Sequence, residues 1–351
     1  MFTSVSSKAI SQRIYTRASL LSVESGGRKM VRYIIIRFLW MCVILMIVGT
    51  IAFYGARIAH MVIWGQRMPL FDLLPIVREQ FLVYLERIVT EWNWGYVGSP
   101  ASPESIIETM RNAVPYTLRI NLIAMGIAIG LALFFGVTSA WKKNTVYDYA
   151  VNTFCLVFSS IPSYVWILGA MIVFGIWYKW LPVIFPLHSG APWHFYVRGY
   201  FLPVLAMIGM PLAVLTQMIR GEITEQYNAD FLLLAKVKGL RKDQIVIRHL
   251  IRNSILPALE KIPALFTTVM FNGFIVEAIY NVPGVARFFI RNVHSAGGHG
   301  SRDYAYFVID AQVVVIVTLF YAVLALMMTL VVDILYAVID PRITIVGGKK
   351  Q

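Results

Sequence analysis

Side chains spaced for chemistry concentrate in one polar segment, between Arg220 and Lys261. Asp230 can cap a short helix there, because a side-chain carboxylate accepts hydrogen bonds from the free N–H groups of a helix N-terminus. Gly239 can end that helix, because glycine adopts the left-handed conformation found just past many helix C-termini. A second basic, amphipathic helix follows over residues 241–257. The pattern predicts a knob of two short helices at a glycine elbow, a shape that fits a groove in a soluble partner.

Common catalytic signatures are absent from the sequence. Gly347-Gly348-Lys349-Lys350 lacks the spacing and the hydroxyl residue of a phosphate-binding loop, and H-E-x-x-H, G-x-S-x-G and C-x-x-C do not occur. We therefore expect no ATP hydrolysis through that loop motif in this chain. Cys42 and Cys155 fall inside apolar runs, where cysteine acts as a small apolar residue. His294 and His299 could share a metal, but no carboxylate accompanies them at a fixed spacing, which favours a solvated loop.

Ionisable residues within membrane spans would indicate a proton or ion relay. We identify Glu277, Asp310 and Asp333 as the only acids close to the apolar segments, and each lies near the predicted end of a segment. A proton-coupled secondary transporter more often places such a group at the membrane midplane. The pattern therefore favours a structural position for these acids over a relay.

The segments that must position these residues are membrane spans. The chain is 58% hydrophobic and only 14% charged, which makes a water-soluble monomer improbable. A helix needs about 20 apolar residues to cross about 30 Å of hydrocarbon. Six runs are predicted to cross: Phe38–Ala56, Ile120–Trp141, Tyr149–Tyr178, Gly199–Ile219, Ile262–Val276 and Ala311–Val332.

The distribution of positive charge predicts the orientation of the spans. A formal net charge of +13 would raise the question of nucleic acid in a soluble protein, but here its location matters more. Six spans place 20 lysines and arginines on the side of both termini and 11 on the other, so both termini are predicted to be cytoplasmic. The segment 220–261 carries eight of them. A basic loop against anionic lipid headgroups is therefore the alternative interpretation of the knob.

The segments outside the spans, and the prolines within them, also carry structural predictions. Residues 1–29 are predicted to be a disordered cytoplasmic extension, with a transit peptide or a natural start at Met30 as alternatives. The external segment 65–112 contains Phe81, Leu82, Tyr84, Leu85 and Ile88 at helical spacing, which predicts an amphipathic helix on the membrane or packed on the protein. Residues 142–144 form a tight turn between the second and third spans. Prolines at 162, 203 and 211 fall inside the third and fourth runs, where they favour kinks.

Over residues 230–257 the sequence resembles the membrane-spanning permease subunits of bacterial ABC-type importers, in their oligopeptide/dipeptide class. That class carries a loop pattern close to D-Y-x-R-T-A-R-A-K-G-L, followed by V-x-x-R-H-x-L-R-N-A-x-x-P. Leu233, Leu234, Lys236 and Val237 depart from it with bulkier side chains. The matching residues are Asp230, Ala235, Lys238, Gly239, Leu240, Arg248, His249, Arg252, Asn253 and Pro257.

Other motifs of the class are spread over residues 30–343. They are similar to R-Y-x-x-x-R at Arg32–Arg37, L-P-x-T-L at Pro115–Leu118, S-I-P-S-F at Ser160–Tyr164, L-x-W-L-P at Trp180–Pro182, E-x-I-F-x-x-P-G at Glu277–Gly284, R-D-Y at Arg302–Tyr304 and D-x-x-Y-x-x-x-D-P-R-I at Asp333–Ile343. The weakest match is residues 57–112, where the class pattern A-P-G-D-P is missing.

The resemblance implies an all-α, polytopic membrane protein with six transmembrane helices and the type I ABC importer permease fold, in the bacterial cytoplasmic (inner) membrane. It implies a permease domain over residues 30–343 with a cytoplasmic tail at 344–351. The chain would form half of the translocation path of an ATP-driven peptide importer, without being an enzyme. Implied partners are a second homologous permease, two cytoplasmic ATPases that hold ATP and Mg, and an extracytoplasmic peptide-binding protein. The chain itself would hold no catalytic residue, cofactor or metal.

Two roles follow from the resemblance. The loop 220–261 would couple the spans to the ATPases, and Glu277, Pro283 and Gly284 would form an external gating turn, with simple chain reversal as the alternative for that turn. Nickel or another small solute is the alternative cargo. A proton-coupled secondary transporter and a signalling receptor are alternatives of other classes, in which an ATPase-docking loop is not expected.

Overall fold

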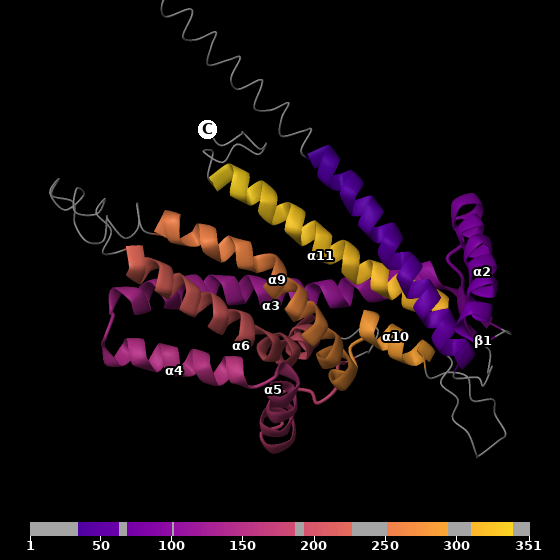
Figure 1. Cartoon of the computed structure of the whole chain (residues 1–351). Coiled ribbons are helices and arrows are strands. Elements are labelled where there is room, and N and C mark those ends of the chain that lie inside the picture. The colour runs from indigo at the N-terminus through magenta and orange to yellow at the C-terminus, as the bar shows by residue number, and fades with distance from the viewer. Residues whose placement is uncertain are drawn as a thin grey trace, which may run out of the picture. The chain divides into compact units, whose positions relative to one another are not determined.

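The computed structural model describes residues 34–62, 69–99, 102–186, 193–226, 251–293 and 310–339. The expectations for residues 1–29 and 344–351 lie outside these ranges. The chain divides into two compact units, one of residues 1–47 with 333–351 and the other of residues 48–332. The helices of the second unit are labelled in Figure 1.

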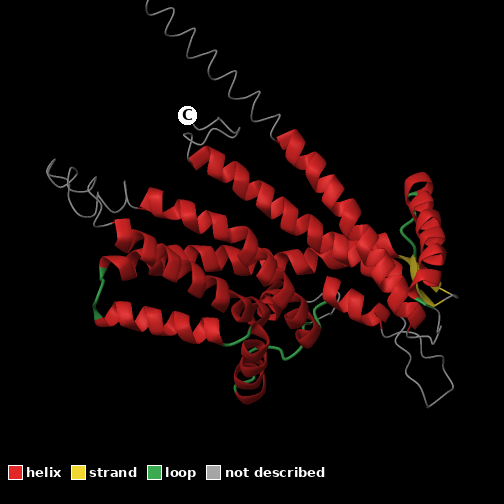
Figure 2. Cartoon of the chain, viewed as in Figure 1, coloured by secondary structure: helices red, strands yellow, loops and turns green. Residues whose placement is uncertain are grey.

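Helices make up almost all of the described structure, as Figure 2 shows. A helix over Ile34–Val62 comes first. The elements after it are α2 (Leu70–Glu91), β1 (Tyr96–Ser99), β2 (Ser102–Ser105), α3 (Ile106–Trp141), α4 (Val146–Ser160), α5 (Ser163–Ala170), the π-helical segment η1 (Met171–Trp177), α6 (Trp193–Gln226), α9 (Ile251–Tyr280), α10 (Val285–Val293) and α11 (Ala311–Ile339).

The six predicted spans correspond to helices of the structure. Within the described residues, five helices are long and apolar enough to cross a membrane, and the number is six if the bent pair α4 and α5–η1 counts as one span. Five of the predicted runs lie wholly inside one of these helices. The prediction of an all-α polytopic fold is confirmed.

The third predicted span is not one helix. α4 and the following helical segment are bent by 98° at Ile161 and Pro162. Pro162 has no N–H group to continue the helix, and it disfavours helical angles in the residue before it, where Ile161 has φ −103° and ψ 123°. The predicted run Tyr149–Tyr178 therefore contains a sharp break. Pro203 and Pro211 do not end a helix in this way and lie inside α6.

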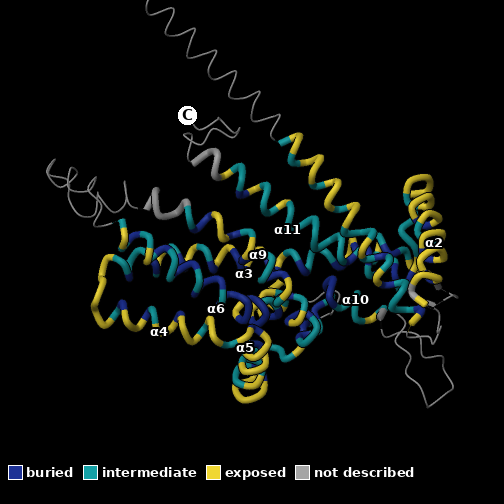
Figure 3. Tube along the Cα trace, in the orientation of Figure 1, coloured by how far each residue is buried: buried dark blue, intermediate teal, exposed yellow. Residues whose placement is uncertain are grey.

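The core of the second unit forms around α6. In its most apolar window 72% of the residues are buried, against 39% for α3, and Figure 3 shows the difference along the chain. Glycines permit this packing: a Cβ on Gly136 of α3 would lie 2.9 Å from the Ile219 side chain, and one on Gly209 would lie 2.6 Å from Phe158. Small residues allow helix backbones to approach closely in a membrane. The outward faces of α4 and α5 expose apolar side chains such as Phe154 and Val165, as a lipid-facing surface does.

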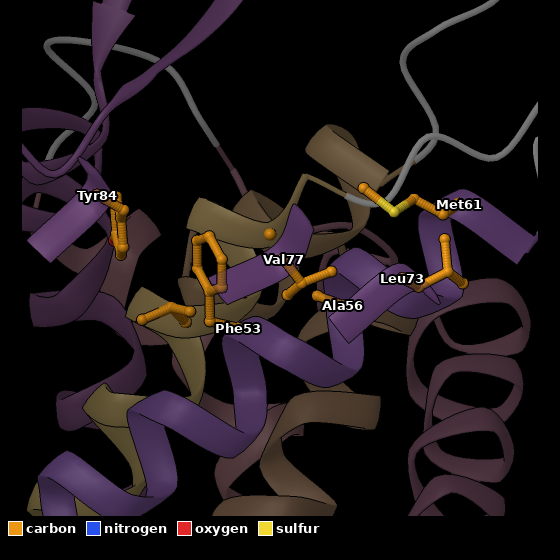
Figure 4. Close-up of a cluster of buried hydrophobic side chains, with 8 residues drawn as sticks. Phe53, Ala56, Met61, Leu73, Val77 and Tyr84 are labelled. Carbon is orange, nitrogen blue, oxygen red and sulfur yellow. The ribbon is translucent and has the colours of Figure 1, made fainter. Parts of the chain in front are cut away.

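The amphipathic helix predicted within residues 65–112 is α2, and it packs on the protein. Leu73, Val77 and Tyr84 are buried against residues that include Phe53 and Ala56 of the helix Ile34–Val62, as Figure 4 shows. Of the residues that predicted it, Phe81 and Ile88 pack against the same cluster. Two others differ from that pattern: Leu82 and Leu85 are exposed, because the buried stripe is narrower than the apolar arc of the helix.

A β-hairpin that the sequence pattern did not predict joins α2 to α3. β1 and β2 are antiparallel, with Tyr96 opposite Ser105 and Val97 opposite Glu104. Gly95, at φ 108°, precedes β1, and a Cβ there would collide with the Gln312 side chain. Asn93 accepts a hydrogen bond from the Gly95 N–H at 3.0 Å, which fixes this turn beside α11.

Candidate functional site

Glu277 is completely buried in the last turn of α9, at the point where the chain reverses into α10. Its Oε2 accepts a hydrogen bond from the Ala286 N–H at 3.2 Å. The Val285 N–H beside it donates to Thr117 Oγ1 of α3 at 2.9 Å. Both donors belong to the first turn of α10, whose N–H groups have no partner within the helix. Side chains from α9 and α3 thus cap α10, and the acidic group lies at the favourable, positive end of its dipole.

Gly284 allows these groups to meet. A Cβ on this residue would collide with Glu277 Oε2 and lie 2.6 Å from Thr117 Oγ1. The turn before it is tight: the Val282 N–H donates to the Glu277 carbonyl at 3.0 Å, and Asn281 has a left-handed φ of 57°. Glu277 and Gly284 therefore meet in one turn, which also contains Pro283, and the gating role of these three residues stays a prediction. Thr117 completes the cluster, although only its motif, and not its role, was noted in the sequence.

The segment that follows η1, with Pro182 and Phe185, contacts the same turn at the end of α9. The Tyr280 hydroxyl donates to the Pro182 carbonyl at 2.7 Å, and the Phe185 N–H donates to the Tyr280 carbonyl at 3.0 Å. The Phe185 ring packs edge-on against Tyr116 at 5.8 Å between centroids. Three motifs that are far apart in the sequence, at 115–118, 180–182 and 277–284, therefore meet in one place. We call this place the Pro283 end of the unit.

One turn further along α3 from Thr117, α3 and α9 contact each other through polar and small residues. Asn121 is fully buried one turn after Thr117, and its Nδ2 donates to the Thr117 carbonyl at 2.7 Å. A Cβ on Gly273 of α9 would lie 2.6 Å from Asn121 Oδ1 and 2.9 Å from Met207 Cε of α6. No described group satisfies Asn121 Oδ1 or Glu277 Oε1. No sequence pattern singled out Asn121 or Gly273, because a lone Asn or Gly in an apolar run usually indicates helix packing.

A cavity of about 570 Å³ opens beside the turn. Pro283 and Gly284 form part of its wall, and charged groups of both signs face it. The charged lining residues are Glu104 of β2, with Arg287 and Arg291 of α10. The charged groups in its wall can contact a polar solute.

Most residues predicted for the coupling loop lie outside the described part of the chain: Asp230, Ala235, Lys238, Gly239, Leu240, Arg248 and His249. The same holds for His294, His299 and the motifs at 302–304 and 340–343. Helices extend into both ends of the segment 220–261, since α6 continues to Gln226 and α9 begins at Ile251. Arg252, Asn253 and Pro257 therefore fall within α9.

The first and last motifs meet in the other compact unit. Arg37 Nη2 lies 2.8 Å from Asp333 Oδ2, so the R-Y-x-x-x-R segment pairs with the start of the C-terminal motif. Both side chains remain partly exposed, which limits the stabilisation that such a pair supplies.

The helices and the buried turn define a polytopic membrane protein of the type I ABC importer permease fold. A sequence model of the family described as "binding-protein-dependent transport system inner membrane component" matches residues 132–345. The match covers more than half of the chain, and this protein belongs to that family. The resemblance inferred from the motifs is confirmed, as is a multi-pass membrane protein.

Relatives within the family are named as peptide transport permeases. The chain is 26% identical to the dipeptide transport system permease protein DppB of Bacillus subtilis, over 75% of this chain and 78% of the relative. It is 25% identical to DppB of Lactococcus lactis over 90% of this chain and 99% of the relative. It is 29% identical to the oligopeptide transport system permease protein OppB of Salmonella typhimurium, over 65% of this chain and 69% of the relative.

Proposed function

We propose that this chain is the permease subunit of an ATP-driven importer of short peptides and forms half of its translocation path. The observation that carries the proposal is that three motifs of the peptide permease class, at 115–118, 180–182 and 277–284, meet at the buried Glu277 turn. The relatives named above are dipeptide and oligopeptide permeases, which supports a peptide cargo. A pocket that recognises mainly peptide backbone and termini could accept many side chains, and the cavity beside Pro283 offers both signs of charge for the two termini.

The partner subunits of the importer are proposed from the same family resemblance. A second, homologous permease would complete the path, and an extracytoplasmic peptide-binding protein would deliver cargo at the Pro283 end. Two cytoplasmic ATPases would dock on the loop between α6 and α9 and supply ATP and Mg. Closure of the ATPases would then move α6 and α9, and with α9 the turn that carries Glu277, so that the site opens alternately to either side.

Deleting this chain is expected to abolish uptake of labelled di- to pentapeptides and to confer resistance to toxic peptide analogues. The reason is that half of the path is lost while the binding protein remains. The measurement needs a strain without redundant peptide importers, and the intact gene supplied in trans is the control. Unchanged peptide uptake with lost accumulation of nickel would replace peptides by the alternative cargo.

The orientation is proposed with the Pro283 end outside and both termini in the cytoplasm. Glu108, in the first turn of α3, and Lys143, just past its last residue, are exposed at opposite ends of one helix of 36 residues. In a background with Cys42 and Cys155 replaced by alanine, an impermeant thiol reagent added to intact cells is expected to label Glu108→Cys and not Lys143→Cys. The reverse labelling would invert the topology, and permeabilised cells provide the control for reactivity.

A further inference from the structure

Asp148 is a buried acid in the first turn of α4, 1% exposed, and it was missed when the acids near apolar segments were identified. It holds Arg220 of α6 in a two-pronged ion pair: Arg220 Nε donates to Oδ1 and Nη2 to Oδ2, both at 2.6 Å. The pair joins residues that lie 72 positions apart in the sequence. A sequence pattern gave no sign of it, because Asp148 stands just outside an apolar run and Arg220 was counted with a basic loop.

The carboxylate of Asp148 is also the centre of a wider network. Ser139 of α3 donates to Oδ1 at 2.5 Å, and Asn152 Nδ2, one turn further along α4, donates to the same oxygen at 2.9 Å. The backbone N–H of Asn144, in the turn between α3 and α4, donates to Oδ2 at 3.0 Å. The network therefore fixes three elements at once: the last turns of α3, the turn 142–145 and the C-terminal part of α6.

Arg220 occupies a particular place on α6. The helix ends at Gln226, less than two turns later, and the chain then enters the segment 227–250. Just before Arg220, Ile219 and the Thr216 carbonyl lie against Gly136 of α3, where no Cβ would fit without displacing them. A guanidinium that donates two parallel bonds restrains the rotation of a helix as well as its distance from a partner. The ion pair therefore holds the last two turns of α6 in one rotation and at one distance from α4.

We propose that Asp148 and Arg220 are a positioning pair, which fixes the C-terminal part of α6 against α3 and α4 and so sets how efficiently ATP hydrolysis is converted into transport. This rests on the proposed function, in which that segment docks on the ATPases. When the ATPases move the docked segment, the Asp148–Arg220 ion pair transmits the movement of α6 to α3 and α4. If the ion pair is weakened, the docked segment moves without moving the membrane-spanning helices.

The test compares variants in the complete importer, reconstituted in proteoliposomes with its ATPases and binding protein. Arg220→Lys keeps the positive charge and loses the two-pronged geometry. The double variant Asp148→Asn/Arg220→Gln removes both charges, so neither partner is left as an uncompensated buried ion. Lys143→Gln is the matched control, because it removes an exposed charge from the same turn. Peptide transported per ATP hydrolysed, thermal unfolding and the amount of bound ATPase are measured for each.

Arg220→Lys is expected to lower the peptide transported per ATP by about threefold or more, because a loosened contact passes on less of the movement. ATPase binding and the unfolding temperature should stay close to those of the wild type, and Lys143→Gln should leave the ratio unchanged. A fall in unfolding temperature and complex yield with an unchanged ratio would overturn the proposal, since it would show a role in stability only. An unchanged ratio in both pair variants would overturn it too.

The wild-type complex separates this proposal from the proposed function. If the wild-type chain binds no ATPase and drives no peptide transport, the proposed function fails, and the coupling role of the pair fails with it. If the wild type couples normally and Gly239→Val in the segment 227–250 uncouples it, while neither pair variant does, the proposed function stands and the positioning pair alone is refuted.

Discussion

Glu277→Ala is expected to destabilise the protein by about 3 kcal/mol, because it leaves the buried Ala286 N–H without an acceptor and opens a cavity in a closely packed turn. Transport should be lost with it, since α10 would lose its cap from α9 and keep only the one from Thr117. Thermal unfolding of the purified chain in lipid nanodiscs, together with peptide uptake in cells, measures both effects. Both side-chain hydrogen bonds that we describe to the first turn of α10 come from this carboxylate and from Thr117.

Two further variants test whether the loss of stability in Glu277→Ala comes from the hydrogen bond to Ala286. Glu277→Gln retains an oxygen at the position that faces Ala286 and should keep most of the stability. Glu260→Ala removes an exposed carboxylate from the same helix and should unfold at the wild-type temperature. If Glu277→Ala unfolds like Glu260→Ala, the turn is held by its backbone alone and the carboxylate is not its cap.

Gly136→Ala is expected to destabilise the protein by about 2 kcal/mol, although alanine is the better helix former. Its Cβ would lie 2.9 Å from both Cβ and Cγ2 of Ile219 and 3.2 Å from the Thr216 carbonyl oxygen, so α3 and α6 would have to separate. Ile219 is branched at the contacting atom and cannot turn away freely. Thermal unfolding gives the size of the effect, and the peptide-to-ATP ratio tests whether separation of these helices also weakens the Asp148–Arg220 ion pair.

Gly130 offers a matched control on the same helix. A Cβ on Gly130 meets no atom within 4 Å, so Gly130→Ala is expected to be neutral or to stabilise the protein by up to about 1 kcal/mol. Effects of the same sign at both positions would contradict the packing of α3 on α6 described above. Opposite signs would locate the close approach of the two helices at Gly136.

The Glu277 turn and the Asp148 network connect the helices of the second unit at two separate places. At the Pro283 end, α9 and α10 are joined to α3 through Glu277 and Thr117. At the opposite end, α6 is joined to α3 and α4 through Asp148. Because α3 runs unbroken from Ile106 to Trp141, it connects both places. This arrangement gives a movement of α6 or α9 a continuous route through the proposed translocation subunit.

Apolar composition by itself determined the number and approximate position of the membrane spans. The reason is physical: hydrocarbon excludes unpaired backbone groups, so a long uncharged run has no other structure available to it. The break at Pro162 could also be foreseen, since proline acts on its own neighbours in the chain. The helical spacing of residues 81–88 likewise predicted α2. The motifs gave the family, and with it the residues of the turn at Glu277, Pro283 and Gly284.

Only the tertiary structure decided which of these residues meet. Thr117 and Val285 are 168 positions apart, and Asp148 and Arg220 are 72 apart, so no local pattern connects them. The sequence likewise left open which apolar side chains of α2 are buried: Tyr84 is covered by the helix Ile34–Val62 and α11, while Leu82 and Leu85 are not. Periodicity reports the apolar arc of one helix, whereas burial depends on the neighbour that packs against it. For the same reason, Gly136 and Gly130 are equivalent in the sequence and differ only once α6 lies against one of them.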